Sequence, residues 1–166
     1  MEFKDYYLCI DEKFINLEHV SCISLDYSRD KIIFQMDYAI QINEKNRKDN
    51  SNRSKITERR ITTGYIVVYG IQDGLNLLKT KKYFNQFFIQ KGLKNDVENV
   101  GYINLEKITS IKYEPDKNRV IINFSNTVSY YDFEKGEVLT SEFLYLNFLS
   151  DTQYENYVEY LNGFIS

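Results

Sequence analysis

Apolar and polar side chains alternate along two stretches of the chain, and each stretch predicts a half-buried β-strand. The first runs from Ile32 to Ile42, and the second runs from Val120 to Tyr130 with Asn126 as its polar exception. A period of two places every second side chain on one face of a strand. Shorter apolar or aromatic runs predict further strands over residues 6–10, 14–17, 20–27, 65–69, 102–105, 108–113 and 143–148.

Two other stretches have the spacing of amphipathic helices. Residues 75–89 place Leu77, Phe84, Phe87 and Phe88 on one stripe, which predicts a single helix. A second helix is predicted with Ser150 or Asp151 as its cap, because Gln153 gives a capping-box arrangement ahead of a long apolar face. That face comprises Tyr154, Tyr157, Val158, Leu161, Phe164 and Ile165.

The hydrophobic pattern occurs twice because part of the sequence is repeated. Residues 14–40 align with residues 102–128 at a shift of 88 without a gap, and both copies contain Ile-Asn-Leu-Glu. Further along, Tyr65-Ile-Val-Val matches Phe143-Leu-Tyr-Leu at a shift of 78. The first copy therefore carries ten more residues between its third and fourth strands.

These patterns predict an α+β protein made of two tandem ββββα repeats. Each antiparallel sheet is followed by a C-terminal helix, and the repeats pack as an intramolecular pseudo-dimer. The predicted boundaries are 1–92, with an insertion at 43–60, and 93–166. Since either half alone would bury only a modest core, we expect one fused globular unit.

The insertion is predicted to be a long, mobile, net-basic loop, because it holds no apolar residue before Ile56. Extra length in one copy of a duplicated scaffold is a common place for function. A tolerated surface elongation is the alternative. The basic residues of the segment are Lys45, Arg47, Lys48, Arg53, Lys55, Arg59 and Arg60.

Composition adds little to these patterns. The 166 residues are 43% hydrophobic and carry a formal net charge of −3, so no global attraction to nucleic acid or acidic membranes is implied. Fifteen tyrosines accompany abundant Lys, Asn, Ile and Phe, which A/T-rich codons favour.

Without a signal peptide or an apolar run of about 20 residues, the chain is predicted to be cytoplasmic and to have no membrane partner. Cys9 and Cys22 are predicted to be buried free thiols.

Enzymatic chemistry is not predicted. The single histidine, His19, lies at a predicted bend and has no marked catalytic partner, and two cysteines cannot build a zinc site. No glycine-rich phosphate loop follows a strand. We therefore expect no catalytic residue, metal or cofactor.

In the repeated Asn-Leu-Glu, the side chains of Asn16 and Asn104 are expected to stabilise bends by hydrogen bonds to the backbone. The alternative is that the two glutamates form a pair of functional sites related by pseudo-symmetry.

A binding surface is predicted from aromatic and basic positions on the sheet faces. Flat aromatic rings stack on bases, and neighbouring cations attract phosphates. The alternative is that these tyrosines pack between the two repeats. The predicted surface comprises Lys31, Arg119, Tyr65, Tyr69, Tyr131 and Tyr145, together with the seven basic residues of the insertion.

Tandem ββββα units resemble the Whirly and PUR families, in topology and without a shared motif. The resemblance implies a non-enzymatic protein that binds single-stranded DNA or RNA across its outward sheet faces near Lys31, Arg119 and Tyr131. The Lys45–Arg60 loop would act as a flexible clamp. The alternative is a protein-interaction or assembly module, or an accessory subunit of a larger complex. Its partner would be another protein or a second copy, paired through an edge such as Tyr6–Ile10.

Overall fold

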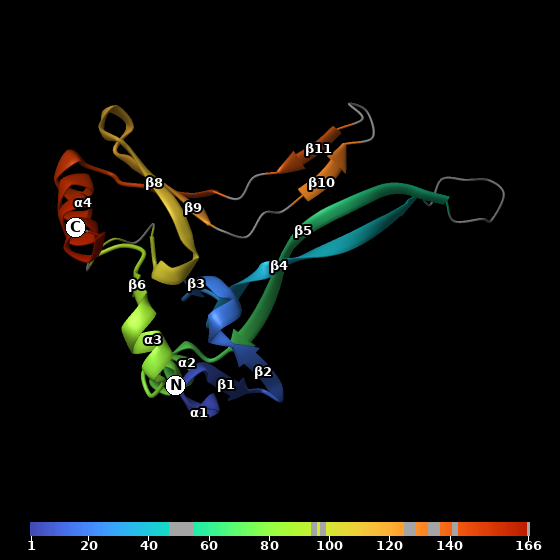
Figure 1. Ribbon diagram of the computed structural model, residues 1–166, viewed down its shortest axis with the longest axis horizontal. Coiled ribbons are helices and arrows are strands. Elements are labelled where there is room, and N and C mark those ends of the chain that lie inside the picture. The colour runs from blue at the N-terminus through green and yellow to red at the C-terminus, as the bar shows by residue number, and fades with distance from the viewer. Residues whose placement is uncertain are drawn as a thin grey trace.

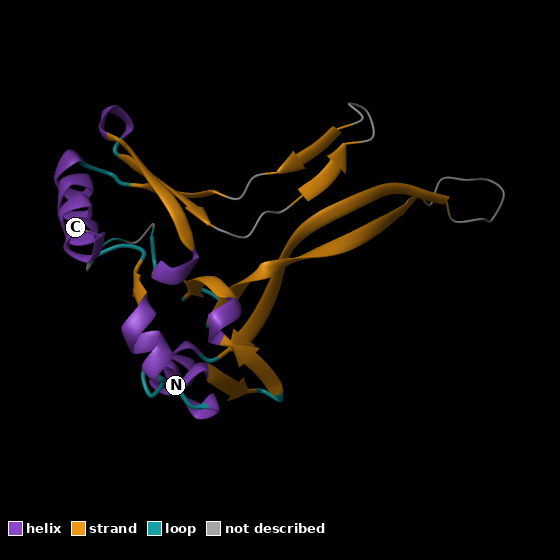
Figure 2. Cartoon of the chain, viewed as in Figure 1, coloured by secondary structure: helices purple, strands orange, loops and turns teal. Residues whose placement is uncertain are grey.

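The computed structural model describes residues 1–46, 55–93, 96, 99–124, 129–132, 137–140 and 143–165. For residues 38–46, 55–63, 129–132 and 137–140, the backbone alone is described. The described chain is α+β, with antiparallel sheets and a C-terminal helix, as predicted (Figures 1 and 2). None of its helices has both the length and the apolar character needed to cross a membrane.

Each half of the chain, with the division taken after residue 78, begins with a short helix and a two-stranded hairpin. The strands over residues 6–10, 14–17 and 102–105 were predicted, but the helix before residue 7 and the strand over residues 88–90 were not. The first half contains α1 (Phe3–Tyr6), β1 (Tyr7–Ile10), β2 (Lys13–Asn16), the 3-10 turn η1 (Leu17–His19), β3 (Val20–Asp26), β4 (Lys31–Asn46), β5 (Lys55–Tyr69) and α2 (Ile71–Leu78). The second contains α3 (Lys82–Phe87), β6 (Phe88–Gln90), β7 (Gly101–Asn104), η2 (Leu105–Lys107), β8 (Ile108–Glu114), η3 (Pro115–Lys117), β9 (Arg119–Phe124), β10 (Ser129–Asp132), β11 (Glu137–Thr140), β12 (Phe143–Asn147) and α4 (Asp151–Ile165).

A five-stranded sheet in the order β5-β4-β3-β7-β6 joins the two halves. Its central pairing is between β3 and β7, where Cys22 lies opposite Ile103 and Ile23 lies opposite Tyr102. A three-stranded sheet has the order β12-β9-β8, and β1-β2 and β10-β11 are separate hairpins. The strand ladder therefore connects residues from both halves directly.

The β3-β7-β6 part of the sheet carries a hydrophobic core on each face. Ile23 and Phe88 belong to the core of the first half, with Tyr102 packed against it. Cys22, Ile89 and Ile103 belong to the core that β9, β12 and α4 build. Successive residues of a strand point to opposite faces, so the same strands serve both cores.

The two copies of the repeated sequence have the same strand register. Asp26 lies opposite Lys31, and Glu114 lies opposite Arg119 at the matching positions. Both first strands are also irregular at the same place, between Val20 and Cys22 and between Ile108 and Ser110. Farther on, Lys31 faces Tyr69 and Arg119 faces Asn147. These pairs confirm the change of shift from 88 to 78 and place the ten extra residues in the first half's hairpin.

The prediction of a loop over residues 43–60 is wrong for 43–46 and 55–60. There β4 and β5 continue as a ladder as far as the pair Asn46 and Lys55. Beyond a register shift between Gln35 and Ala39, this hairpin extends away from the helices (Figure 1), and we call residues 39–46 and 55–63 the β4–β5 arm. A strand satisfies its backbone through its partner even when its side chains are polar, so low hydrophobicity alone did not identify a loop.

The predicted single helix over residues 75–89 is also wrong. Helix α2 ends at Leu78, and Lys81 is extended before α3 begins. Phe88 and Ile89 lie in β6 and enter opposite cores, which a helical stripe does not allow. At the C-terminal helix, the predicted cap is confirmed, because the Gln153 amide donates to the Ser150 hydroxyl at 3.2 Å and its side chain accepts from the Leu149 amide at 3.1 Å.

Candidate functional site

Three tyrosines of the predicted binding surface are exposed. Tyr65 and Tyr69 lie on β5 with 54% and 67% of their surface accessible, and Tyr145 lies on β12 with 49% accessible. The alternative, that these three pack between the halves, is therefore wrong. The strands sit at the edges of different sheets, so Tyr145 is not on the same strand ladder as the other two.

The two cations predicted on the sheet faces are each paired with a carboxylate. Lys31 Nζ lies 4.0 Å from Asp26 Oδ2, and Arg119 Nε donates to Glu114 Oε2 at 2.6 Å. The Arg119 bond holds the pKa of Glu114 below its usual value. Arg119 also lies 5.0 Å above the Tyr145 ring. Each cation thus lies beside a carboxylate that offsets part of its positive charge on the sheet face.

The basic residues of the insertion are placed on the β4–β5 arm where the structure describes them. Lys45 lies opposite Ile56, Arg59 opposite Asn43, Arg60 opposite Ile42, and Lys55 opposite Asn46. Arg47, Lys48 and Arg53 fall outside the described residues. Tyr65 and Tyr69 follow on the same strand, β5. The structure therefore places the described part of the basic segment and two exposed tyrosines on the same ribbon.

The hairpin of the second half has the opposite charge. Residues 43–60 contain seven Lys or Arg against three Asp or Glu, whereas residues 125–142 contain four Asp or Glu against one Lys. Strand β10 lies against β5 (Figure 1), which sets the acidic hairpin beside the basic arm. Tyr131, another predicted site residue, lies in β10 opposite Val138.

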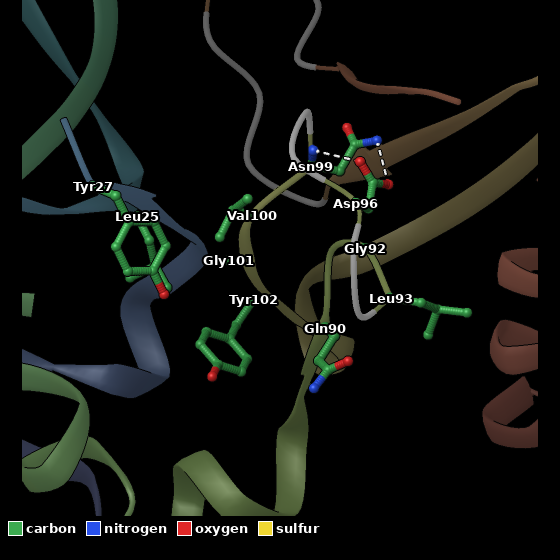
Figure 3. A pocket seen from close by; sticks show the side chains of 10 residues that line it. All are labelled: Leu25, Tyr27, Gln90, Gly92, Leu93, Asp96, Asn99, Val100, Gly101 and Tyr102. Carbon is green, nitrogen blue, oxygen red and sulfur yellow. Dashed lines mark hydrogen bonds between the residues drawn. The ribbon is translucent and has the colours of Figure 1, made fainter. Parts of the chain in front are cut away.

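A pocket of about 550 Å³ opens between the end of β3 and residues 90–102. Figure 3 shows the rings of Tyr27 and Tyr102 at one end of it and the Asp96 carboxylate at the other. That carboxylate accepts from the backbone and side-chain nitrogens of Asn99, each at 3.1 Å. No lysine or arginine is among the described residues of its lining. The pocket therefore suits an apolar or neutral group better than a phosphate, and it is separate from the arm.

A polar cluster at the base of the arm was not predicted. Lys107 Nζ donates to Asp37 Oδ2 at 2.8 Å, and His19 Nδ1 lies 3.0 Å from the same oxygen. Burial raises the pKa of Asp37, but the bonds from Lys107 and His19 lower it more, so the net pKa lies below the ordinary value. His19 is thus a half-exposed partner of Asp37 rather than a bend residue alone. The repeat carried one signal for this cluster, because His19 and Lys107 occupy equivalent positions of the two copies, 88 residues apart.

The asparagine-capped bends are confirmed in both copies. The Glu18 amide donates to Asn16 Oδ1 at 3.0 Å, and the Glu106 amide donates to Asn104 Oδ1 at 3.1 Å. Asn104 is fully buried, and its Nδ2 also donates to the Val20 carbonyl at 2.9 Å, which ties the second half to the first. The Tyr83 hydroxyl donates to Glu106 at 2.8 Å. The repeated motif is therefore part of the junction between the halves.

The thiols differ from each other. Cys22 is buried, but Cys9 is exposed, so its predicted burial is wrong. Cys9 lies opposite Phe14 on the outer face of the β1–β2 hairpin, which no second layer covers among the described residues. Within the described chain, no group of three or more His, Cys, Asp or Glu side chains is placed to hold a metal ion.

Comparisons of the chain with protein-family models, curated proteins and solved structures give no match.

Proposed function

We propose that this protein is a non-enzymatic nucleic-acid-binding protein that uses the β4–β5 arm and the adjacent tyrosines of β5. The observation that supports this most is that the described residues of the net-basic segment 43–60, residues 43–46 and 55–60, lie on a two-stranded ribbon. Such a ribbon can follow a phosphate backbone or enter a groove. Because the sheet-face cations are paired, the arm supplies the attraction that the net charge of −3 does not.

Tyr65 and Tyr69 favour a single strand over a duplex. They occupy alternate positions of one face of β5, about 13 Å apart at the rise of a β-strand. Exposed aromatic rings stack on unpaired bases, each worth about 1–3 kcal/mol, and the bases of a duplex are not accessible in this way. We propose that the arm holds the phosphates and that these two tyrosines hold bases.

The fold that we propose for this function is a pair of related units packed as an intramolecular pseudo-dimer, similar to the Whirly and PUR plan. The shared register, the matching irregularities and the two asparagine caps support it. In this arrangement the first unit carries the binding arm. The second unit carries the shorter, acidic hairpin.

A salt-dependent titration tests the proposal. The variant Arg59→Gln/Arg60→Gln removes two arm charges, and Lys79→Gln/Lys117→Gln removes two charges from exposed positions elsewhere. Fluorescence anisotropy with a labelled single-stranded oligonucleotide should show weaker binding by the arm variant alone. Its slope of log affinity against log salt should fall by about 1.4, which is two phosphate contacts on a single strand. Equal losses in both variants, or no binding by the native protein at low salt, would contradict the proposal.

A second candidate function, protein interaction, is favoured by a different surface. Phe3 and Phe14 at the N-terminal hairpin are 59% and 68% exposed, although they are large apolar side chains. Exposed apolar patches of this kind mark protein-binding sites. If the oligonucleotide titration fails while these phenylalanines prove necessary for association, the protein is an interaction module.

A further inference from the structure

Two aromatic hairpins in this chain correspond to each other. The N-terminal aromatic hairpin is α1, β1 and β2, and the central aromatic hairpin is α3, β6 and β7. In the first, Leu8 lies opposite Ile15, and in the second, Ile89 lies opposite Ile103. All four of these side chains are buried, each pair in the core of its own half. The two hairpins therefore have matching inner faces.

The outer face of the central aromatic hairpin packs on the first half of the chain. Strand β7 adds to the edge of β3, and the hairpin contributes Phe84 and Phe88 to the core beneath it. Phe84 is only 5% exposed, and its ring meets Tyr102 edge-on at 4.9 Å. Asn104 completes the contact through its bond to the Val20 carbonyl.

The N-terminal aromatic hairpin has the same outer face, and two of its three rings, Phe3 and Phe14, are exposed. Phe3, Tyr7 and Phe14 occupy the positions of Phe84, Phe88 and Tyr102, by shifts of 81 for α1–β1 and 88 for β2. The Phe3 and Tyr7 rings stack at 3.9 Å, so the aromatic cluster is formed. It is nevertheless largely open to solvent, with Phe14 68% exposed against the half-buried Tyr102.

The strand edge that would receive this hairpin is open as well. Strand β3 has a partner on each side, β4 and β7, whereas its counterpart β8 is paired with β9 alone within the described chain. Accordingly, Val20 and Ile23 are fully buried, while the matching Ile108 and Ile111 are only partly buried. The Leu25 amide donates to the Val100 carbonyl across the β3–β7 junction, so the matching amide of Tyr113 points to the outer edge of β8.

We propose that the N-terminal aromatic hairpin of one copy docks on the outer edge of β8 in a second copy, and so repeats the internal β3–β7 contact between molecules. The register follows from the shift of 88: Ile111 would lie opposite Phe14 of the second copy, and Ser110 opposite Ile15 of the second copy. The contact is head-to-tail, so each added copy leaves one hairpin and one β8 edge open. This proposal does not depend on nucleic-acid binding.

One residue weakens the intermolecular contact relative to the internal one. A Cβ atom at Gly101 would lie 1.9 Å from the Ile23 carbonyl oxygen, so this close approach requires glycine. Lys13 occupies the matching position in β2. The pairing of β2 with β8 is therefore limited to Phe14 and Ile15, and we expect association in the range of about 10 μM to 1 mM.

Sedimentation of the full chain over that concentration range tests the proposal. The mass of the native protein should rise with concentration. Phe14→Asp should lower the association constant at least about tenfold, whereas Tyr65→Asp, an equal charge change at another exposed aromatic residue, should leave it unchanged. Lys13→Gly should strengthen association, because it removes the side chain that blocks the third pair.

Hydrogen exchange identifies the receiving edge without altering it. At high concentration, the amides of residues 108–114 should gain protection in the native protein and not in Phe14→Asp. A native protein that remains a single chain at about 1 mM would overturn the proposal. So would equal effects of Phe14→Asp and Tyr65→Asp, or protection that appears elsewhere than on β8.

Discussion

The two halves of this protein agree at their bends and differ in their hairpins. At the bends, asparagine caps, strand irregularities and cross-strand pairs recur at a spacing of 88 residues. In the hairpins, the first half has ten more residues and a net-basic sequence, and the second half has a net-acidic one. Side chains that bond to the backbone or enter a core fix the geometry, whereas a solvated hairpin can change length and charge at small cost.

The junction between the halves adds a second difference, because the asparagine of the motif is fully buried in one copy and half-buried in the other. Asn104 and Tyr102 contact the first half, whereas Asn16 and Phe14 face solvent to a larger extent. Identical residues in the two copies therefore need not contribute equally to the free energy of unfolding. The following substitutions measure how far the copies differ.

The largest effect is expected at Gly101. Alanine there would strain a backbone with φ of +143° and press its Cβ against the Ile23 carbonyl oxygen. We expect Gly101→Ala to lower the free energy of unfolding by about 3 kcal/mol or more, measured by urea denaturation. Gly163→Ala is the control, since its Cβ meets nothing within 4 Å and should stabilise α4 by up to about 1 kcal/mol. Similar stabilities of the two variants would contradict this account of the junction.

A smaller difference is expected between the two asparagine caps. Asn104→Ala loses the cap on Glu106 and leaves the buried Val20 carbonyl without its side-chain donor, which should cost about 2–3 kcal/mol. Asn16→Ala loses the matching cap on Glu18 at a half-buried site, which should cost about 1 kcal/mol. Urea unfolding of both variants measures the difference. Equal losses of stability would mean that the asparagines stabilise the protein through their caps alone, and that the contact of Asn104 with the first half adds nothing.

A pH-dependent effect is expected at Asp37, whose pKa is held below its ordinary value of 3.8 by bonds from Lys107 and His19. A carboxylate with a lowered folded-state pKa stabilises the protein above its unfolded-state pKa and loses this contribution as pH falls through the folded value. Asp37→Asn should therefore cost about 1–2 kcal/mol at pH 7 and progressively less below about pH 4. Lys107→Met should reproduce most of this loss. A cost that does not change with pH would rule out the ion pair as its cause.

The features that could be predicted from the sequence are those with local or repeated signals. Ile-Asn-Leu-Glu marked both bends, and the shift from 88 to 78 marked the unequal hairpins before any strand pairing was known. The amphipathic C-terminal helix was also predictable, since its apolar face and its cap at Ser150 are contiguous in sequence.

The features that were missed depend on contacts between distant residues. Beyond Ile42 the arm lacks an apolar pattern, and its strands are held by backbone pairing across the ladder, as at Asn43 and Arg59. Phe84 to Ile89 fit a helical stripe, but Phe88 and Ile89 serve two different cores. The bond between Lys107 and Asp37 joins residues 70 positions apart, and no local pattern indicates it.

The central claim is that the unequal length and charge of the two hairpins carry the binding function, and shortening the arm tests it most directly. Replacing residues 44–57 with a four-residue turn removes the ten extra residues and five of the seven basic side chains of 43–60. The shortened protein should unfold at the same temperature as the native protein, because the cores are untouched. In an oligonucleotide titration at low salt it should lose at least about 100-fold in affinity. A shortened protein that binds the single strand as tightly as the native one would contradict the account.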